Sequence, residues 1–167
     1  MKKTRSHSKK GLIILIIITV VLCAVTVLKK QEQPEEYTEN KSDYIDSVRP
    51  DIDVELLTPN EYSRPQIPIE SVQYIAIHYT ANPGSTAQDN RDYFNGLQYS
   101  GQTEASSNFI VGLDGEIIQC VPTWEIAYAS NERNADTVSI EVCHPDETGK
   151  FTDATYRSLV QLTAWLC

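Results

Sequence analysis

The stretch that most constrains the fold is residues 72–80, VQYIAIHYT, an apolar run that ends near a histidine. Its β-branched residues and its lack of charge predict a strand buried on both faces. Alternation places His78 on the face opposite to Ile77 and Tyr79. The histidine therefore lies at the end of a predicted core strand, just before the loop 81–85. Loops at strand ends are where α/β proteins place functional sites.

The N-terminal part of the chain predicts a membrane anchor. Residues 11–28 are apolar and uncharged, and as a helix at roughly 1.5 Å per residue they would span about 27 Å, close to the ~30 Å hydrocarbon core. The basic tail of residues 1–10 predicts a cytoplasmic N-terminus. We expect an uncleaved, single-pass anchor in the cell membrane with the rest of the chain outside. A cleaved signal peptide is the alternative, but no small-x-small cleavage site follows the apolar run.

The charge of the first 30 residues differs in sign from that of the rest of the chain. The first 30 residues hold 7 of the 14 basic residues and none of the 23 acidic ones. The strongly acidic remainder excludes nucleic acid as a partner, because phosphates require a basic surface. Residues 31–64 are polar and acidic with scattered apolar positions, which predicts a flexible linker. Within it, residues 52–57 have the composition of either a short strand or a short helix.

Residues 65–167 read as one α/β domain. A helix is predicted to begin after Ser85 or Thr86 and to run to about Leu97. A hairpin is predicted next, with strands at 108–112 and 116–121. Between them, Asp114-Gly115 predicts a two-residue turn.

The last two predicted elements are a strand and a helix. Residues 137–143, TVSIEVC, alternate in polarity, which predicts a half-buried strand that carries Glu141. A helix should follow Thr152 or Asp153. Its apolar stripe continues to Cys167 without a stop signal, so we expect a domain that is incomplete at its C-terminus.

Several separated motifs occur together in a familiar order: YIAIHYTANPGS, SSNFIVGLDGEIIQCVP, EIAYAS and NADTVSIEVCHPDETGKFTDATYRSLVQL. Across residues 70–167 they resemble the zinc-dependent N-acetylmuramoyl-L-alanine amidases, which are related to phage lysozyme-type amidases and to peptidoglycan recognition proteins. The resemblance implies an α/β fold with a mixed β-sheet flanked by helices, here preceded by the predicted transmembrane helix. With the predicted anchor placing the domain outside the membrane, we expect it to face the cell wall.

The resemblance implies a peptidoglycan hydrolase that cleaves the amide between N-acetylmuramic acid and the L-alanine of the stem peptide. Its cofactor would be Zn²⁺, with His78 as a metal ligand and Glu141 as the catalytic carboxylate. Substrate contacts are expected at Tyr79, Asn108, Trp124 and Tyr128. Asn108 departs from the family pattern, in which many members carry a histidine before the aromatic residue.

The zinc ligands are incomplete in this sequence. In the family a second histidine and then a cysteine or aspartate follow the helix that begins near Asp153, and this chain ends inside that helix. His144 adjoins Cys143, so the two side chains should point to opposite faces and not hold one metal. The cysteines lack CxxC spacing, so no structural zinc site is predicted. Among Cys120, Cys143 and Cys167, either a free thiol or one disulfide of unassigned partners is possible. A non-catalytic peptidoglycan-binding module and an inactive truncated fragment are therefore the alternative interpretations.

Overall fold

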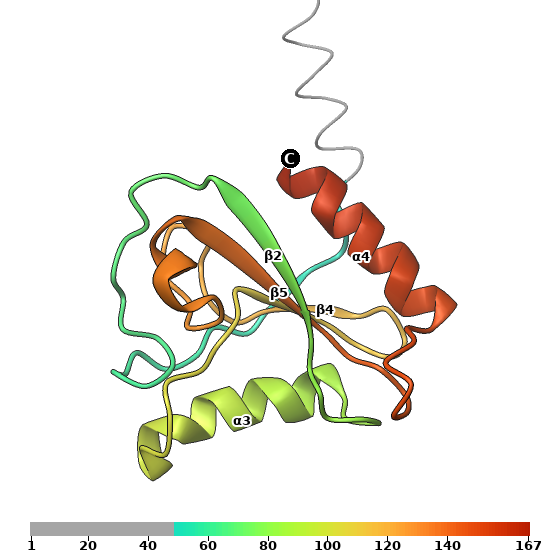
Figure 1. Cartoon of the computed structure of the whole chain (residues 1–167), viewed down its shortest axis with the longest axis horizontal. Coiled ribbons are helices and arrows are strands. Elements are labelled where there is room, and N and C mark those ends of the chain that lie inside the picture. Colours follow the sequence, from blue (N-terminus) through green and yellow to red (C-terminus); the bar gives the residue numbers. More distant parts are fainter. Residues whose placement is uncertain (1–48) are drawn as a thin grey trace, which may run out of the picture. The chain divides into compact units, whose positions relative to one another are not determined.

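The computed structural model of the protein describes residues 49–167, which contain a five-stranded mixed sheet with a long helix on either face (Figure 1). The elements in chain order are β1 (Asp53–Val54), β2 (Tyr74–Tyr79), α3 (Ala87–Ser100), β3 (Phe109–Val111), β4 (Ile117–Gln119), the 3-10 helix η1 (Asn131–Asp136), β5 (Thr137–Val142) and α4 (Asp153–Leu166). The strand order is β1-β4-β3-β5-β2. Only the β3–β4 pair is antiparallel among these strands. The predicted mixed sheet flanked by helices is confirmed.

Alternation along the strands divides the core into two layers. In β3, Ile110 packs in the cluster that contains Phe94 of α3. Its neighbour Phe109 packs in the second cluster, with Leu159 and Leu162 of α4. Successive side chains of a strand point to opposite faces, so α3 and α4 cover opposite faces of the sheet.

The two parallel strands β2 and β5 occupy positions that differ from the prediction. β2 lies at the edge of the sheet, and Tyr74, Ile77 and Tyr79 are 55%, 48% and 56% exposed. β5 lies between β3 and β2, and five of its six residues are buried. The prediction that 72–80 is buried on both faces is therefore wrong, and so is that of a half-buried strand at 137–143. The burial of a strand depends on its position in the sheet, and a hydrophobic pattern does not reveal that position. β2 is exposed because it lies at the edge, and β5 is buried because it lies between two strands.

Both long helices begin at the predicted residues. Thr86 caps α3 through a capping box with Asp89, in which each side chain accepts from the other residue's backbone N–H. Gly101 ends the helix with a left-handed φ of 58°, so α3 is one turn longer than predicted. The hydroxyl of Thr152 accepts from the N–H of Thr155 and caps α4.

The predicted hairpin is present, but its turn is longer than two residues. The N–H of Gly112 donates to the carbonyl oxygen of Glu116 at 2.8 Å, which leaves residues 113–115 as a three-residue loop. Gly115 has φ 88° in this loop. Three-residue hairpin loops place glycine at the position with positive φ. The Asp-Gly pair therefore indicated the location of the turn correctly but not its length.

The folded unit begins before residue 65. β1 pairs with β4 in the sheet, and Leu57 is 1% exposed in the core. The guanidinium of Arg64 donates to both carboxylate oxygens of Glu125, at 2.8 and 3.0 Å. The linker predicted to extend to residue 64 thus ends earlier, and of the two alternatives for 52–57 the strand is correct.

The predicted tail 1–10 and transmembrane segment 11–28 lie outside the described residues. Within residues 49–167, neither helix is long and apolar enough to cross a membrane.

Candidate active site

The site is built on the carboxyl ends of the parallel strands β2 and β5. His78 and Glu141 are partners in the β2–β5 register, each one residue before its strand ends. Directly paired residues share a face of the sheet, and neighbouring strands lie about 4.8 Å apart. Val138, Ile140 and Val142 pack in the α4 cluster, so Glu141 and His78 lie on the opposite face. Carboxyl ends of parallel strands are a common place for ligand sites in α/β folds.

Glu141 is held in an environment that disfavours its charge. Its Oε2 is buried and has no hydrogen-bond partner within the described residues. Burial raises the pKa of Glu141 from an ordinary 4.5 to about 7. A carboxyl group with this pKa exchanges a proton readily near neutral pH, which suits general acid–base work.

The loop before β5 positions groups beside His78. The hydroxyl of Ser130 lies 3.5 Å from His78 Nε2. Ser130 is in turn fixed by Asn134, whose Oδ1 accepts from the backbone N–H groups of Ser130 and Ala129 at 2.7 and 3.1 Å. The turn that begins η1 therefore holds a hydroxyl against the imidazole nitrogen.

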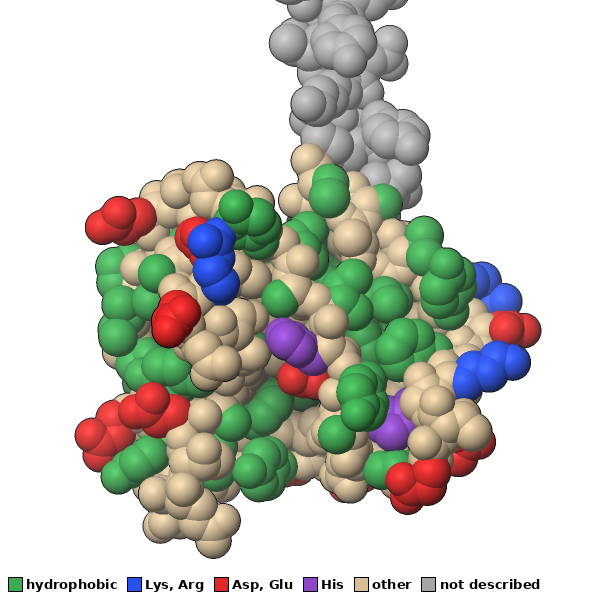
Figure 2. All heavy atoms as spheres, viewed as in Figure 1, with side chains coloured by type: hydrophobic (Ala, Val, Ile, Leu, Met, Phe, Trp, Pro, Cys, Tyr) green, Lys and Arg blue, Asp and Glu red, His purple; other side chains and the backbone are tan. Residues whose placement is uncertain are grey.

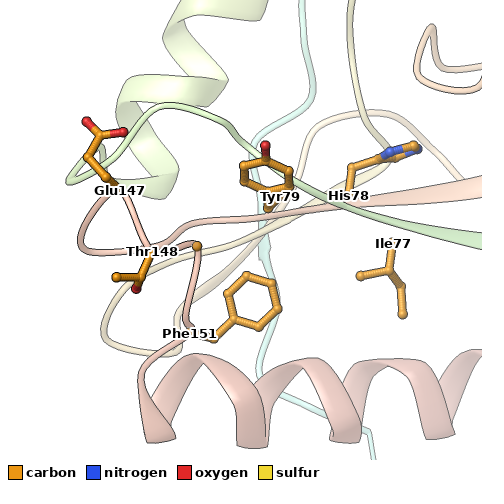
Figure 3. A pocket seen from close by; sticks show the side chains of 7 residues that line it. Ile77, His78, Tyr79, Glu147, Thr148 and Phe151 are labelled. Carbon is orange, nitrogen blue, oxygen red and sulfur yellow. The ribbon is translucent and has the colours of Figure 1, made fainter.

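His78 opens onto a hollow of about 480 Å³ at the end of β2. Figure 3 shows Tyr79, Glu147 and Phe151 around it, with Ile77 directed toward α4 and His78 directed away from it. In the space-filling view of this face, a histidine lies next to an acidic side chain near the centre (Figure 2). The hollow is thus bordered by an imidazole, a phenol and a carboxylate.

The residues described so far do not supply enough ligands to coordinate a metal ion. Among residues 49–167, no group of three or more His, Cys, Asp or Glu side chains is arranged to hold one. His78 and the neighbouring Glu141 supply one nitrogen and one carboxylate. A catalytic zinc takes about three protein ligands and an open position. The described donor set therefore does not fit a complete zinc site.

Comparison with known families matches the segment that carries this geometry. The family model described as N-acetylmuramoyl-L-alanine amidase matches residues 68–167. The chain belongs to this amidase family. The resemblance seen in the sequence motifs is thereby confirmed.

Curated relatives in the amidase family are longer than this chain. N-acetylmuramoyl-L-alanine amidase CwlL of Bacillus licheniformis is 31% identical over 120 residues, which cover 65% of this chain and 33% of that protein. BlyA of Bacillus subtilis, also named as an N-acetylmuramoyl-L-alanine amidase, is 37% identical over 73 residues, 44% of this chain and 18% of that protein. The matched parts of the chain span a third or less of these relatives.

Solved structures share the fold. PlyL superposes with a TM-score of 0.57 at 23% identity and covers 70% of this chain and 72% of its own. The Drosophila peptidoglycan recognition protein SA has a TM-score of 0.52 at 18% identity, with 70% and 71% covered. At these identities the likeness shows the sheet and helices of the amidase fold and not a shared activity.

The residues predicted to contact substrate are distributed over the domain. Tyr79 borders the hollow with His78. Trp124 is 67% exposed in the loop after β4. Tyr128 is half-buried, and its N–H donates to Ser106 Oγ at 2.9 Å. Trp124 and Tyr128 do not border the hollow at His78, so their substrate contacts remain predictions.

Asn108 is placed inside the protein. It is fully buried, and its Oδ1 accepts from the N–H of Ser139 at 2.9 Å. Its Nδ2 lies 3.1 to 3.4 Å from three carbonyl oxygens, those of Val121, Pro122 and Glu125. The side chain thus joins β5 to the loop after β4, and this geometry favours a structural role over direct substrate contact.

His144 and Cys143 point apart, as their adjacency predicted. Cys143 packs in the α3 cluster, while the ring of His144 lies edge-on to Tyr79 at 5.2 Å. His144 Nδ1 donates to the carbonyl oxygen of Asp146 at 2.7 Å. The three described cysteines are all free. Burial raises the pKa of the Cys120 and Cys143 thiols to about 12, so both are unreactive at neutral pH.

Sequence reasoning missed Ser130 and Asn134. Ser130 closes the aromatic-bearing EIAYAS segment. Its contact with His78 depends on how η1 turns the chain back toward β2. The two residues are 52 positions apart, so the sequence alone does not indicate this contact. Asn134 accepts from N–H groups four and five residues before it, and no pattern in the sequence indicates that this turn faces His78.

Proposed function

We propose that the chain is a peptidoglycan hydrolase that cleaves the amide between the lactyl group of N-acetylmuramic acid and the L-alanine of the stem peptide. One observation carries the proposal: His78 and Glu141 are register partners at the carboxyl ends of β2 and β5, inside the segment that the amidase family model matches. The relatives named for this activity support the choice of bond.

Glu141 is the residue that moves the proton in this proposal. Its carboxylate accepts a proton from the attacking water, whose oxygen adds to the amide carbonyl carbon. The carbon–nitrogen bond then breaks, and Glu141 returns the proton to the departing L-alanine nitrogen. A pKa of about 7 allows both transfers near neutral pH. The bound water or substrate would also satisfy the unpartnered Oε2.

Zn²⁺ is the cofactor we propose, with His78 as one ligand. The half-buried imidazole lies at the border of the hollow and has only a long contact with Ser130, so a nitrogen is available for a metal. Further ligands would have to come from outside residues 49–167. Ser130 would then orient the His78 ring, as outer-shell partners of metal-bound histidines do.

We further propose that residues 11–28 anchor the protein in the cell membrane, with a cytoplasmic N-terminus and the amidase domain outside it, facing the cell wall. The apolar run and the basic residues before it support this arrangement. Peptidoglycan would then be the partner on the outer side of the membrane.

The test measures L-alanine amino termini released from purified peptidoglycan, together with the zinc content of the protein. We expect His78→Ala to lose both zinc and activity, and Glu141→Gln to lower turnover by 100-fold or more while zinc stays bound. Glu132→Gln, an exposed carboxylate on η1, is the matched control and should leave both unchanged. Near wild-type turnover in His78→Ala would refute the ligand role, and loss of zinc in Glu141→Gln would refute the proposed role of Glu141.

A non-catalytic peptidoglycan-binding module is the second candidate. The missing three-donor group within the described residues favours it. This candidate predicts zinc content near zero, saturable binding of a muramyl peptide and no released amino termini. Zinc in a 1:1 ratio with turnover would exclude it.

A further inference from the structure

The 3-10 helix η1 runs back along β2 on the face that carries His78; it is the short orange coil beside β5 in Figure 1. Ser130, directly before η1, lies at His78, and Asp136, its last residue, accepts from the backbone N–H of Gln73 at 2.8 Å. The lengths agree, because the six residues of η1 rise about 12 Å and the strand from Tyr74 to His78 spans about 13 Å. One element thus reaches from the start of β2 to its histidine.

Burial does not hold η1 in this place. None of its six residues is buried, and 3-10 helices longer than three or four residues are uncommon because their hydrogen-bond geometry is poor. Its first residue, Asn131, has φ 51°, in the sparsely populated left-handed region. Polar contacts therefore decide where η1 lies on the sheet.

Arg133 supplies such a contact at the end of η1 that is far from His78. Its guanidinium carbon lies 4.2 Å from the centre of the Tyr74 ring, and its Nη2 lies 2.7 Å from Asp136 Oδ2. A planar guanidinium can stack on an aromatic face and bond a carboxylate at the same time. The backbone N–H of Arg133 also donates to the carbonyl oxygen of Ser130 at 3.0 Å. Arg133 therefore connects β2 to the residue that touches His78.

The contact at His78 is sensitive to the position of η1. Ser130 Oγ and His78 Nε2 are 3.5 Å apart, at the long end of the hydrogen-bond range. A small displacement of η1 would separate the hydroxyl from the ring. The hydrogen bond at one ring nitrogen determines where a neutral imidazole carries its proton, so the loss of this bond would mix the two tautomers.

We propose that Arg133 and Tyr74 are positioning residues for His78. Their stacked contact holds η1 along β2, so that the Ser130 hydroxyl stays on Nε2 and the imidazole keeps one orientation and one tautomer. The use of His78 in hydrolysis rests on the proposed function. The contact itself and its test do not.

The test uses the metal-free, full-length chain in detergent micelles, without substrate. The amide of Gln73 donates to the last residue of η1, so its hydrogen exchange measured by NMR reports how often η1 leaves β2. We expect Arg133→Met and Tyr74→Leu to speed this exchange about 2- to 5-fold, the factor that corresponds to an exposed cation–π contact. Tyr74→Phe keeps the aromatic face and should leave the exchange unchanged.

The signature at His78 is read from long-range ¹H–¹⁵N spectra of the imidazole rings. In the wild type we expect one tautomer, with widely separated shifts of the two ring nitrogens. In Arg133→Met and Tyr74→Leu these shifts should move toward each other as the tautomers mix. His144 is an internal control, because its Nδ1 donates to the carbonyl oxygen of Asp146 at 2.7 Å. Its signals should not change in these variants.

A double variant tests whether Arg133 acts through Ser130. Ser130→Ala alone should mix the tautomers of His78, and Arg133→Met added to it should change the His78 spectrum no further. Arg157→Met removes an exposed arginine from α4 and is the matched control. It should alter neither the Gln73 exchange nor the imidazole spectrum.

Four results would overturn the proposal. They are unchanged Gln73 exchange or an unchanged His78 spectrum in Arg133→Met, equal effects of Tyr74→Phe and Tyr74→Leu, a further change in the double variant, and faster exchange throughout α3 as well. The last result would show a general loss of stability in place of a local one. None of these readouts requires hydrolysis, so a failure here and a failure of the proposed function are distinguishable.

Discussion

Glu141 shows how one buried carboxyl group couples the site to the stability of the fold. It projects from β5, an interior strand of the sheet, and burial raises its pKa to about 7. The folded protein therefore holds a proton on this group at pH values where the unfolded chain, with an ordinary pKa of 4.5, has released it. The stabilisation is complete below pH 4.5 and is lost as the pH rises through 7.

We predict that this loss is measurable in metal-free protein. Between pH 4.5 and pH 8, the free energy of unfolding of the wild type should fall by about 3 kcal/mol more than that of Glu141→Gln, since each pKa unit corresponds to about 1.4 kcal/mol. Urea unfolding at a series of pH values measures it. Parallel curves for the two proteins would show that Glu141 has an ordinary pKa.

Asn108 offers a test that separates a structural role from a substrate role. Asn108→Ala removes the acceptor of the Ser139 N–H and the side-chain donor to the carbonyl oxygens of Val121 and Glu125. We predict a loss of about 2–4 kcal/mol in the free energy of unfolding, because unsatisfied buried polar groups cost about 1–3 kcal/mol each. Denaturant unfolding measures this loss. Unchanged stability with weakened muramyl peptide binding would instead support the contact predicted from the sequence.

Single residues were predictable where a local rule decided them. Thr86 and Thr152 were recognisable as helix caps because the cap bonds lie within three residues. Asn108 and Ser130 were not, because their partners are distant in sequence. A side chain's role at such positions is set by the tertiary fold and not by its neighbours.

At the level of elements, a glycine allows the β3–β4 hairpin to pack closely against α4. A Cβ atom on Gly115 would lie 2.8 Å from Ser158 Oγ and 3.0 Å from the carbonyl oxygen of Ala154, and its φ is 88°. Both the backbone conformation and the close approach of the helix therefore require the absence of a side chain.

We predict that Gly115→Ala destabilises the fold by about 1–3 kcal/mol, because it adds left-handed strain and displaces α4 from the hairpin. Gly149→Ala is a useful control. That residue also has a positive φ, 68°, but no atom lies within 4 Å of the added carbon. Thermal unfolding of both variants measures the difference. Equal losses would mean that contact with α4 contributes nothing.

The sequence located most elements but not their order in the sheet. The patterns at 72–80 and 137–143 both predict strands, and both strands exist. Their burial is the reverse of the expectation, because β3 pairs with the more polar strand. Asn108 accepts from both the N–H and the hydroxyl of Ser139, which lets this polar residue occupy a buried position on an interior strand.

At the level of the whole domain, residues 49–64 are part of the fold. Leu57 lies in the core, and Arg64 joins this segment to Glu125 by a paired hydrogen bond in a largely buried position. The acidic and weakly apolar composition of residues 49–64 predicts a linker and gives no indication that they pack in the core. Composition averages over a window, whereas this segment is held by a few specific contacts: the pairing of β1 with β4, the buried Leu57 and the Arg64–Glu125 ion pair.

We predict that a chain starting at residue 65 loses cooperative unfolding, or unfolds at least 10 °C lower than a chain starting at residue 49. Removal of the segment exposes the α3 core layer and leaves the Glu125 carboxylate buried without its cation. Circular dichroism melting curves compare the two. Equal melting temperatures would restore the linker boundary at residue 64.

The pairing of β2 with β5 also affects when the chain can fold. Each residue of β2 pairs with a residue 63 positions later in the sequence. Contacts between distant positions form slowly, because a long loop must close before they stabilise anything. During synthesis, the apolar residues 74–79 therefore emerge long before β5 exists to receive them. Until then these residues are exposed to misassociation, and we expect a chaperone that acts on the folding domain to bind them there.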